Sequence, residues 1–270
     1  MTDKYAVIGN PVHHSKSPLI HQSFAKQYSQ NMVYSAELIP LNGLEEGLKN
    51  LQALGFTGVN VTVPFKEEVW ELIENKSEFS ALAGAVNTIT IQEDGTLYAD
   101  NTDGVGLCRD LTDNHGIQLN NKRILLLGAG GAARGVIQPL LEQRPAELII
   151  ANRTISKAQN IVDHFTGFGD ISATGFTAVA GDFDIIINAT SASLQGQVPP
   201  IPATAVTHKT FCYDMMYSNE DTCFVQWAKQ QHAFKSIDGL GMLVEQAAEA
   251  FRLWRGIKPE TQSVIKLLRT

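Results

Sequence analysis

Cysteine is scarce in this chain. Its 270 residues include only Cys108, Cys212 and Cys223, which are scattered and odd in number. A disulfide framework is therefore excluded as a source of stability, and the pattern is typical of a reducing compartment. The Cys and His residues also lack the spacing of a metal site. We expect a cytoplasmic protein without a bound metal.

Long apolar runs and basic blocks are missing as well. No uninterrupted apolar run approaches the ~18 residues of a membrane-spanning helix, and residues 1–11 enter a strand-like run without a cationic leader. With a formal net charge of −7 and no dense Lys/Arg block, the chain is not expected to bind nucleic acid. Because 44% of the residues are hydrophobic, it can bury one large core or two ordinary ones, and a small molecule is the expected ligand.

Short strand-like runs alternate with helical patterns. Strands are expected at residues 4–9, 33–39, 58–63 and 86–91, with helices at 17–29, 44–55 and 66–73. A hairpin signal at 93–95 and a helix from 104 toward 115 lead to a second alternation, with strands at 123–128, 147–151 and 184–190 and helices at 132–142 and 156–165. This order predicts an α/β protein of two α/β units, the first with a mainly parallel sheet. A helix beginning at Met242 is apolar on one face and is expected to pack on the first unit.

A glycine-rich turn follows the expected strand at 123–128. Gly128, Gly130 and Ala133 form a G-x-G-x-x-A frame between a strand and a helix. Small residues there let the backbone approach a pyrophosphate at a helix N-terminus, so the second unit is expected to be a Rossmann-like dinucleotide-binding domain. A tight turn without a ligand is the alternative.

The end of the next strand indicates which dinucleotide binds. NAD-binding units usually have an acidic residue there to hold the ribose hydroxyl. This chain instead has Asn152-Arg153-Thr154, with Lys157 one turn later. Arg153 offers a planar fork that suits a phosphate, which favours NADP over NAD. A solvated surface charge is the alternative interpretation of Arg153.

Several polar residues of the first unit have two interpretations. Ser17 is placed to cap a helix, yet Ser15 and Ser17 together also present hydroxyl and N–H groups to an anion. Asn87 interrupts an apolar strand and needs a hydrogen-bond partner. Lys66 and Asp103 each stand where a helix begins, so one could be an exposed first-turn lysine and the other a helix cap.

Taken together, nine motifs resemble the shikimate dehydrogenase family, in the family's order and over the full length of the chain: GNPVHHSKSP, NVTVPFKEE, LAGAVNT, DNTDGVG, GAGGAARG, NRT, INATS, YDMMY and DGLGMLVEQAA. The resemblance implies an NADP-dependent oxidoreductase that reversibly reduces 3-dehydroshikimate to shikimate in aromatic amino acid biosynthesis. It also implies a substrate-binding domain, residues 1–103 plus 239–270, and an NADP-binding domain, residues 104–238. A monomer or homodimer is expected.

The resemblance assigns roles to individual residues. Lys66 and Asp103 would form the catalytic pair. The implied substrate contacts are Ser15, Ser17, Asn60, Thr62, Asn87, Tyr217 and Gln246. The implied cofactor contacts are Gly128, Ala129, Gly130, Gly131, Ala132, Asn152, Arg153, Thr154, Lys157, Thr190, Met215, Gly239 and Met242, together with Glu78, from a position sometimes associated with the cofactor.

Two positions depart from the family pattern. Lys157 stands where many relatives have arginine, so selectivity for NADP is expected to be softer. Residues 192–194 follow the NATS motif where relatives commonly have a glycine, so the loop at 192–197 is the least predictable part of the site. Two alternatives stay open, a quinate/shikimate dehydrogenase that uses NAD and a non-catalytic NADP(H)-binding sensor.

Overall fold

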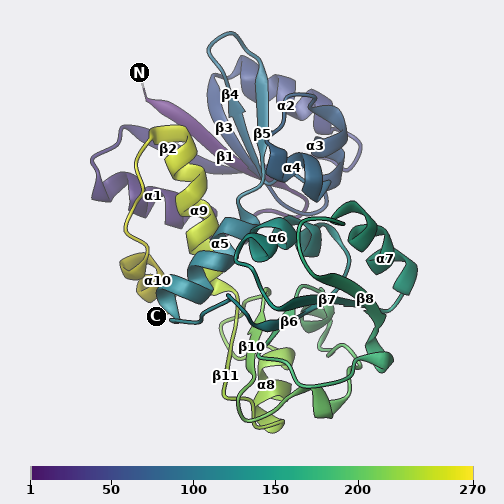
Figure 1. The fold of residues 1–270 in the computed structure, drawn as a ribbon. Coiled ribbons are helices and arrows are strands. Elements are labelled where there is room, and N and C mark those ends of the chain that lie inside the picture. Colours follow the sequence, from purple (N-terminus) through teal and green to yellow (C-terminus); the bar gives the residue numbers. More distant parts are fainter. Residues whose placement is uncertain (1, 270) are drawn as a thin grey trace. The chain divides into compact units, whose positions relative to one another are not determined.

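The computed structural model describes residues 2–269, which form two compact units (Figure 1). The first unit contains the chain up to Gly106 together with Leu243–Leu268, and the second contains Leu107–Met242 and Arg269. Among the helices formed by residues 2–269, none has both the length and the apolar character that crossing a membrane requires.

The first unit is built on a five-stranded sheet in the order β2-β1-β3-β4-β5. β1 (Asp3–Gly9) pairs in parallel with β2 (Met32–Leu38) and β3 (Phe56–Val61). β4 (Thr88–Ile91) pairs antiparallel with β3 and with β5 (Leu97–Asp100). The sheet is therefore mixed, with as many antiparallel as parallel pairings, where a mainly parallel sheet was expected: β4 enters antiparallel to β3 after two helices, and a short hairpin then reverses the chain into β5.

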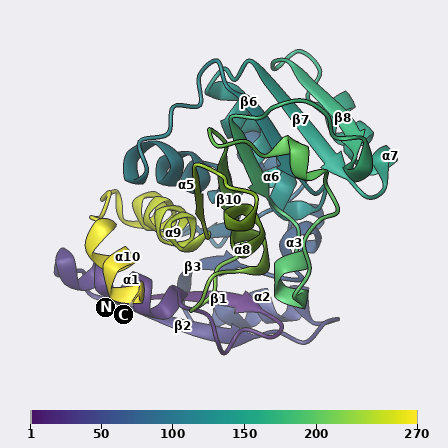
Figure 2. The same cartoon turned by 90° about the horizontal axis from the view of Figure 1, so that it is seen from below.

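The terminal helix packs on the first unit, as its apolar face predicts. Ile20 and Phe24 of α1 (Ser17–Gln27) share a buried cluster with Val244 and Phe251 of α9 (Leu240–Arg255) and with Val264 of α10 (Gln262–Arg269). Figure 2 shows α1 in purple beside α9 and α10 in yellow. The expected helix from 104 toward 115 begins at Asp103 as α5 and ends as a π-helical turn, Asp110–Asn114. The helices before β6 (Arg123–Leu127) and after β11 (Lys235–Ile237) are α1 (Ser17–Gln27), α2 (Leu44–Ala53), α3 (Lys66–Leu72), α4 (Glu78–Ala83), α5 (Asp103–Arg109), α9 (Leu240–Arg255) and α10 (Gln262–Arg269).

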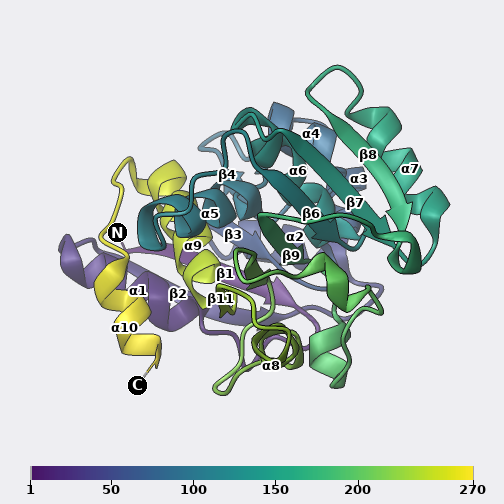
Figure 3. The same cartoon turned by 60° about the horizontal axis from the view of Figure 1, so that its bottom comes forward.

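The second unit contains a six-stranded sheet in which every neighbouring pair is parallel. Its order is β11-β10-β9-β6-β7-β8, so the chain winds outward from β6 in one direction and from β9 in the other (Figure 3). Ligands bind at such a reversal point in open α/β sheets, and the glycine turn follows β6. The elements are β6 (Arg123–Leu127), α6 (Gly131–Glu142), β7 (Glu147–Asn152), α7 (Ile155–His164), β8 (Ile171–Gly175), β9 (Ile185–Asn188), β10 (Phe211–Asp214), α8 (Cys223–Gln230) and β11 (Lys235–Ile237).

A buried histidine lies in an aromatic cluster of the first unit. The His21 ring stacks on Tyr34, with centroids 4.2 Å apart and planes 5° apart, and meets Phe24 edge-on. Neither ring nitrogen of His21 has a hydrogen-bond partner among the described residues. Burial lowers the pKa of His21 to about 3, a shift that the nearby Asn60 side chain opposes. The imidazole is therefore neutral and serves as a flat packing surface for Tyr34.

Replacing His21 by phenylalanine is expected to make the protein less sensitive to acid. The unfolded chain takes up a proton at His21 near its ordinary pKa of 6.5, whereas the folded protein does so only near 3, so stability is lost as the pH falls between these values. At about pH 5 this linkage amounts to about 2 kcal/mol. We therefore expect the free energy of unfolding, measured by urea titration, to fall by about 2 kcal/mol more in the wild type than in His21→Phe when the pH is lowered from about 7.5 to about 5. Equal pH dependence in both proteins would mean that the folded structure accommodates the charged ring.

Candidate active site

The ends of two strands bring Lys66 and Asp103 together. β4 is antiparallel to both β3 and β5, so β3 and β5 run in the same direction and end at the same edge of the sheet. α3 begins at Lys66 shortly after β3 ends, and α5 begins at Asp103 shortly after β5 ends. The buried Phe65 ring anchors the turn before Lys66 in the core. The two side chains therefore meet, although they are 37 residues apart in the sequence.

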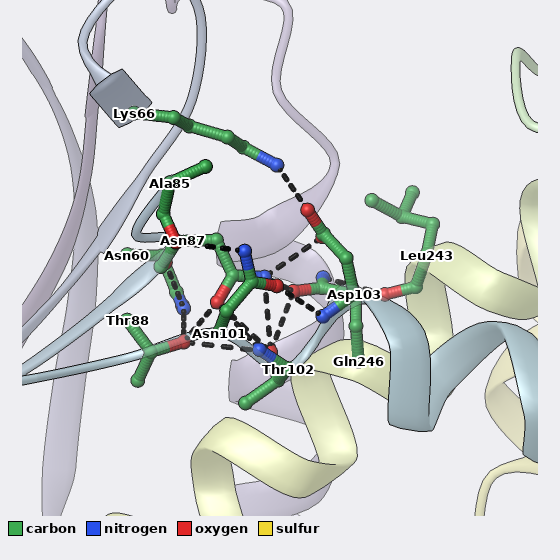
Figure 4. Close-up of polar contacts among 10 residues, drawn as sticks. All are labelled: Asn60, Lys66, Ala85, Asn87, Thr88, Asn101, Thr102, Asp103, Leu243 and Gln246. Carbon is green, nitrogen blue, oxygen red and sulfur yellow. Dashed lines mark hydrogen bonds and ion pairs between the residues drawn. The ribbon is translucent and has the colours of Figure 1, made fainter. Parts of the chain in front are cut away.

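The Lys66 ammonium donates to the Asp103 carboxylate. Lys66 Nζ lies 2.5 Å from Asp103 Oδ2, and Asn87 Nδ2 lies 2.8 Å from Asp103 Oδ1, so each carboxylate oxygen has a donor (Figure 4). The side chain of Asp103 is 8% exposed and that of Lys66 is 21% exposed. This partly buried pair is unlike the exposed first-turn lysine that the sequence left open. The carboxylate holds the ammonium in one place, as a positioned proton donor requires.

Asn87 and Gln246 complete this polar cluster. Asn87 Oδ1 accepts from the Thr102 backbone N–H over 2.8 Å, and Asn87 Nδ2 lies 3.4 Å from Gln246 Oε1. Gln246 belongs to α9, which can approach α5 because residue 106 is glycine. An added Cβ at Gly106 would lie 2.7 Å from the backbone nitrogen of Gln246. The structure thus brings together four residues that the sequence singled out, Lys66, Asn87, Asp103 and Gln246.

Ser15 and Ser17 lie where α1 begins. The prediction that Ser17 caps this helix is wrong, because Lys16 already has helical backbone angles and takes the cap position, with Ser17 as the first helical residue. The Ser17 N–H donates to the Ser15 hydroxyl over 3.3 Å. The Lys16 side chain makes no capping hydrogen bond with any described residue. An anion therefore stays chemically suited to this turn, and the role of the two serines remains a prediction.

The other predicted substrate residues are spread over both units. Asn60 is buried near the end of β3, and Thr62 is half-buried just after it. Tyr217 belongs to the second unit, where burial raises the pKa of its hydroxyl. Glu78, considered for the cofactor, is the exposed first residue of α4. The roles of these four residues remain predictions.

The glycine turn of the second unit is open where a dinucleotide would approach. Gly128 has a φ of +111°, and an added Cβ would lie 3.1 Å from Thr190 Cγ2, so the turn requires glycine there. An added Cβ at Gly130 would meet no atom of the described residues within 4 Å. α6 then starts at Gly131 without an acidic residue in its first turn. The positive end of the helix dipole is therefore available to an anion such as a pyrophosphate.

Two cations follow the next strand. β7 ends at Asn152, whose Nδ2 donates to the Thr154 carbonyl oxygen over 2.9 Å and so folds the turn. Arg153 and Thr154 are exposed, and Lys157 is exposed in the first turn of α7. Residues 152–154 include no carboxylate. The set fits the extra phosphate of NADP better than the bare ribose of NAD.

Further predicted cofactor residues gather at the ends of β9 and β10. The Thr190 hydroxyl donates to Asn188 Oδ1 over 2.7 Å, and the Met215 N–H donates to the Asn188 carbonyl oxygen over 2.9 Å. An added Cβ at Gly239 would lie 2.4 Å from the Met215 carbonyl oxygen, so this close approach requires glycine. Met242 is buried in the first turn of α9. Thr190, Met215 and Gly239 thus form one connected region of the second unit.

A serine anchors the loop that was least predictable. Residues Ala192–Gln195 form a 3-10 turn, from which the Ser193 hydroxyl donates to Asp214 Oδ2 over 2.6 Å. The Thr222 hydroxyl donates to the same oxygen, also over 2.6 Å. Burial raises the pKa of Asp214, and these hydrogen bonds oppose that shift. Within the segment that departs from the family pattern, Ser193 therefore ties the loop to a buried carboxylate.

The structure adds polar residues that the motifs did not single out. The Thr88 and Thr102 hydroxyls both hydrogen-bond to Asn87 Oδ1, over 2.8 Å and 3.2 Å. Asn101 Oδ1 accepts from the Asp103 backbone N–H over 3.0 Å. The available signal was the uninterrupted polar run 100–103 directly after a strand, since buried polar side chains must find partners. No group of three His, Cys, Asp or Glu side chains in the described part of the chain is arranged to hold a metal.

The second unit has an all-parallel sheet and an open glycine turn beside two cations, and the first unit has a lysine–carboxylate pair, so the chain has the parts of a nicotinamide-dependent dehydrogenase. Three family models match it. They are the shikimate dehydrogenase substrate binding domain at residues 7–89, shikimate / quinate 5-dehydrogenase at 110–196, and the shikimate 5'-dehydrogenase C-terminal domain at 239–269.

Full-length relatives agree with these models. The chain is 52% identical over 267 residues to the NADP(+) shikimate dehydrogenase of Hahella chejuensis, covering 99% of this chain and 98% of the relative. It is 50% identical over 269 residues to that of Alkalilimnicola ehrlichii, covering 100% and 99%. The crystal structure of Thermus thermophilus shikimate 5-dehydrogenase with NADP(H) and shikimate has a TM-score of 0.89 and 32% identity, covering 99% of both chains. The chain belongs to the shikimate dehydrogenase family.

Proposed function

We infer that this chain is an NADP-dependent shikimate dehydrogenase, which reversibly reduces 3-dehydroshikimate to shikimate in the biosynthesis of chorismate and the aromatic amino acids. Full-length similarity to two NADP(+) enzymes confirms the family, the activity and the cofactor predicted from the sequence. The observation that carries the activity is the partly buried Lys66–Asp103 pair. Binding of a dinucleotide alone would not need that pair.

We assign substrate binding to residues 1–103 plus 239–270 and NADP binding to residues 104–238. The mixed sheet and α9 carry the lysine–carboxylate pair and Gln246, and the all-parallel sheet carries the glycine turn. The chain passes from one compact unit to the other within α5 and again within α9, close to the proposed boundaries.

Lys66 transfers the proton of the reaction. NADPH, when bound, supplies the hydride that reduces the substrate carbonyl, and NADP+ accepts it in the reverse direction. During reduction the Lys66 ammonium donates a proton to the substrate oxygen that becomes a hydroxyl, and during oxidation the amine takes that proton back. Asp103 orients Lys66 through its Oδ2 and is itself oriented by Asn87 through its Oδ1.

The substrate carboxylate is assigned to Ser15 and Ser17, because hydroxyl and N–H groups at a helix start favour an anion. Asn87 and Gln246 lie next to Asp103 and are assigned to the substrate hydroxyls. The remaining residues proposed around the ring are Asn60, Thr62 and Tyr217.

NADP fits the second unit because the turn at Gly130 is open and Arg153 replaces the usual carboxylate. We assign the pyrophosphate to residues 128–132 and the phosphorylated ribose to residues 152–154 with Lys157. Thr190, Met215, Gly239 and Met242 are assigned to the nicotinamide half, and Glu78 to the cofactor more generally. We further propose a monomer or homodimer that works in the cytoplasm, in keeping with three cysteines that are all free.

Incubating the purified protein with shikimate and NADP is expected to produce NADPH, measured by absorbance, at a rate far above that with quinate and NAD. The chemical reason is that Arg153 and Lys157 complement a phosphate that NAD lacks. Turnover of quinate with NAD alone would instead identify a quinate/shikimate dehydrogenase. Tight NADPH binding without turnover of either acid would identify a sensor.

A further inference from the structure

A buried chain of hydrogen bonds in the first unit leads from β2 to the lysine–carboxylate pair. The Tyr34 hydroxyl donates to Asn60 Oδ1 over 2.7 Å, and Asn60 Nδ2 donates to the Thr88 hydroxyl over 3.1 Å. The Thr88 hydroxyl donates to Asn87 Oδ1 over 2.8 Å, and Asn87 Nδ2 donates to Asp103 Oδ1 over 2.8 Å. Figure 4 shows the part of this chain from Asn60 to Asp103. All five side chains are buried.

Backbone groups fix the orientation of the two amide side chains in this series of hydrogen bonds. Asn60 must turn its amino group toward Thr88, because the same group donates to the Asn87 carbonyl oxygen over 3.1 Å. Asn87 must turn its oxygen toward Thr88, because that oxygen accepts the Thr102 backbone N–H. The Thr88 hydroxyl lies between an N–H donor and an amide oxygen, so it can only donate to Asn87. Each link therefore donates toward Asp103, and the remaining Asp103 oxygen is left for Lys66.

The other end of the chain reaches the serine turn. Burial raises the pKa of Tyr34 well above 10, a shift that the nearby Ser17 side chain opposes, so Tyr34 keeps its proton and donates it to Asn60. The neutral His21 ring, stacked on Tyr34, holds the phenol in place. Ser17 has one hydroxyl proton, so a proton that it gives to a carboxylate is not available to Tyr34.

We propose that Tyr34 is a positioning residue that links the carboxylate end of the substrate site to Asp103, an inference that rests on the proposed function. When Ser17 turns its proton to the substrate carboxylate, Tyr34 still donates to Asn60, so the alignment of Asn87 and Asp103 survives substrate binding. Without the Tyr34 hydroxyl, Asn60 Oδ1 is a buried acceptor that lacks its donor, and Asn60 is held only by the two weaker hydrogen bonds of its Nδ2 group, each 3.1 Å long.

Replacing Tyr34 by phenylalanine is therefore expected to lower kcat roughly tenfold while the KM for shikimate changes little. Tyr5 provides a matched control: it is the direct partner of Tyr34 across β1 and β2 and is equally buried, but its hydroxyl accepts from Arg255. We expect Tyr5→Phe to keep kcat within about twofold of the wild type. Steady-state kinetics with shikimate and NADP measures both variants. Equal kcat losses in both, or a Tyr34→Phe enzyme with wild-type kcat, would overturn the proposal.

A second substitution that interrupts the series of hydrogen bonds covers the case in which Tyr34→Phe does not fold. Thr88→Val removes a hydroxyl at constant shape, and Thr90→Val is its control on the same face of β4. Thr88→Val is expected to lower kcat at least as much as Tyr34→Phe does. The double variant should lose no more than Thr88→Val, because both substitutions interrupt the same series of hydrogen bonds. Additive losses would show that the two hydroxyls act separately. A folded wild type that does not oxidise shikimate would contradict the proposed function, whereas an active wild type with equally active variants overturns only the role of Tyr34.

Discussion

Replacing Lys66 by alanine is expected to lower kcat by about two to four orders of magnitude, the usual contribution of a general acid or base. The hydride and the proton must both move, and in the first unit Lys66 is the donor that Asp103 holds at the end of the buried polar cluster. The KM for shikimate should change little, because the proton transfer belongs to the transition state rather than to ground-state binding. Steady-state kinetics over a range of shikimate concentrations at saturating NADP measures both quantities.

The matched control is another lysine of an ion pair. Lys49 pairs with Glu45 on the surface of α2, with side chains 69% and 64% exposed, so Lys49→Ala should leave kcat unchanged. Asp103→Asn should be comparably damaging to Lys66→Ala, and the double variant should lose less than the sum, since the two groups act as a unit. A Lys66→Ala enzyme with near-wild-type kcat across the pH range would show that the ion pair is structural only.

The meeting of Lys66 and Asp103 could be predicted only in part. The hairpin signal at 93–95 is a local pattern that makes β5 antiparallel to β4, but the alternation of strands and helices predicts β4 parallel to β3, so local patterns do not place the ends of β3 and β5 at one edge. The strand order, which places β4 between them, is set by long-range pairing that no local pattern contains. The prediction that Lys66 and Asp103 act together came from the resemblance to a family, and the topology explains why the two side chains meet.

Two of the elements that were not predicted from the sequence, β8 and α4, have weak local patterns. β8 has no fully buried residue, so Ile171–Gly175 lacks the apolar run of a strand, and α4 is only six residues long. The role of Tyr34 escaped for another reason. In the sequence it is one aromatic residue of a strand, and its hydrogen bond to Asn60 joins residues 26 positions apart. Donor directions depend on such tertiary partners, and spacing along the chain does not determine them.

Replacing Arg153 by aspartate is expected to weaken NADP binding about 10- to 100-fold more than NAD binding, because hydrogen bonds to a charged group are each worth about 1.5–3 kcal/mol. Arg153 is exposed at the end of β7, with no carboxylate in residues 152–154, and its guanidinium can contact the 2′-phosphate through two N–H groups. Lys157→Ala should shift the preference in the same direction by less, since an ammonium acts as a point charge. Calorimetric titration with each dinucleotide measures affinity without relying on turnover.

The same change in net charge at another position of the second unit is not expected to alter the preference for NADP over NAD. Lys209→Asp alters the charge of the second unit by the same amount at another exposed position and should weaken both dinucleotides equally and slightly. If Arg153→Asp also weakened both cofactors equally, Arg153 would be a solvated surface charge. A larger effect of Lys157→Ala than of Arg153→Asp would instead assign the phosphate to the helix α7. In that case the lysine that replaces the family's common arginine would set the preference for NADP.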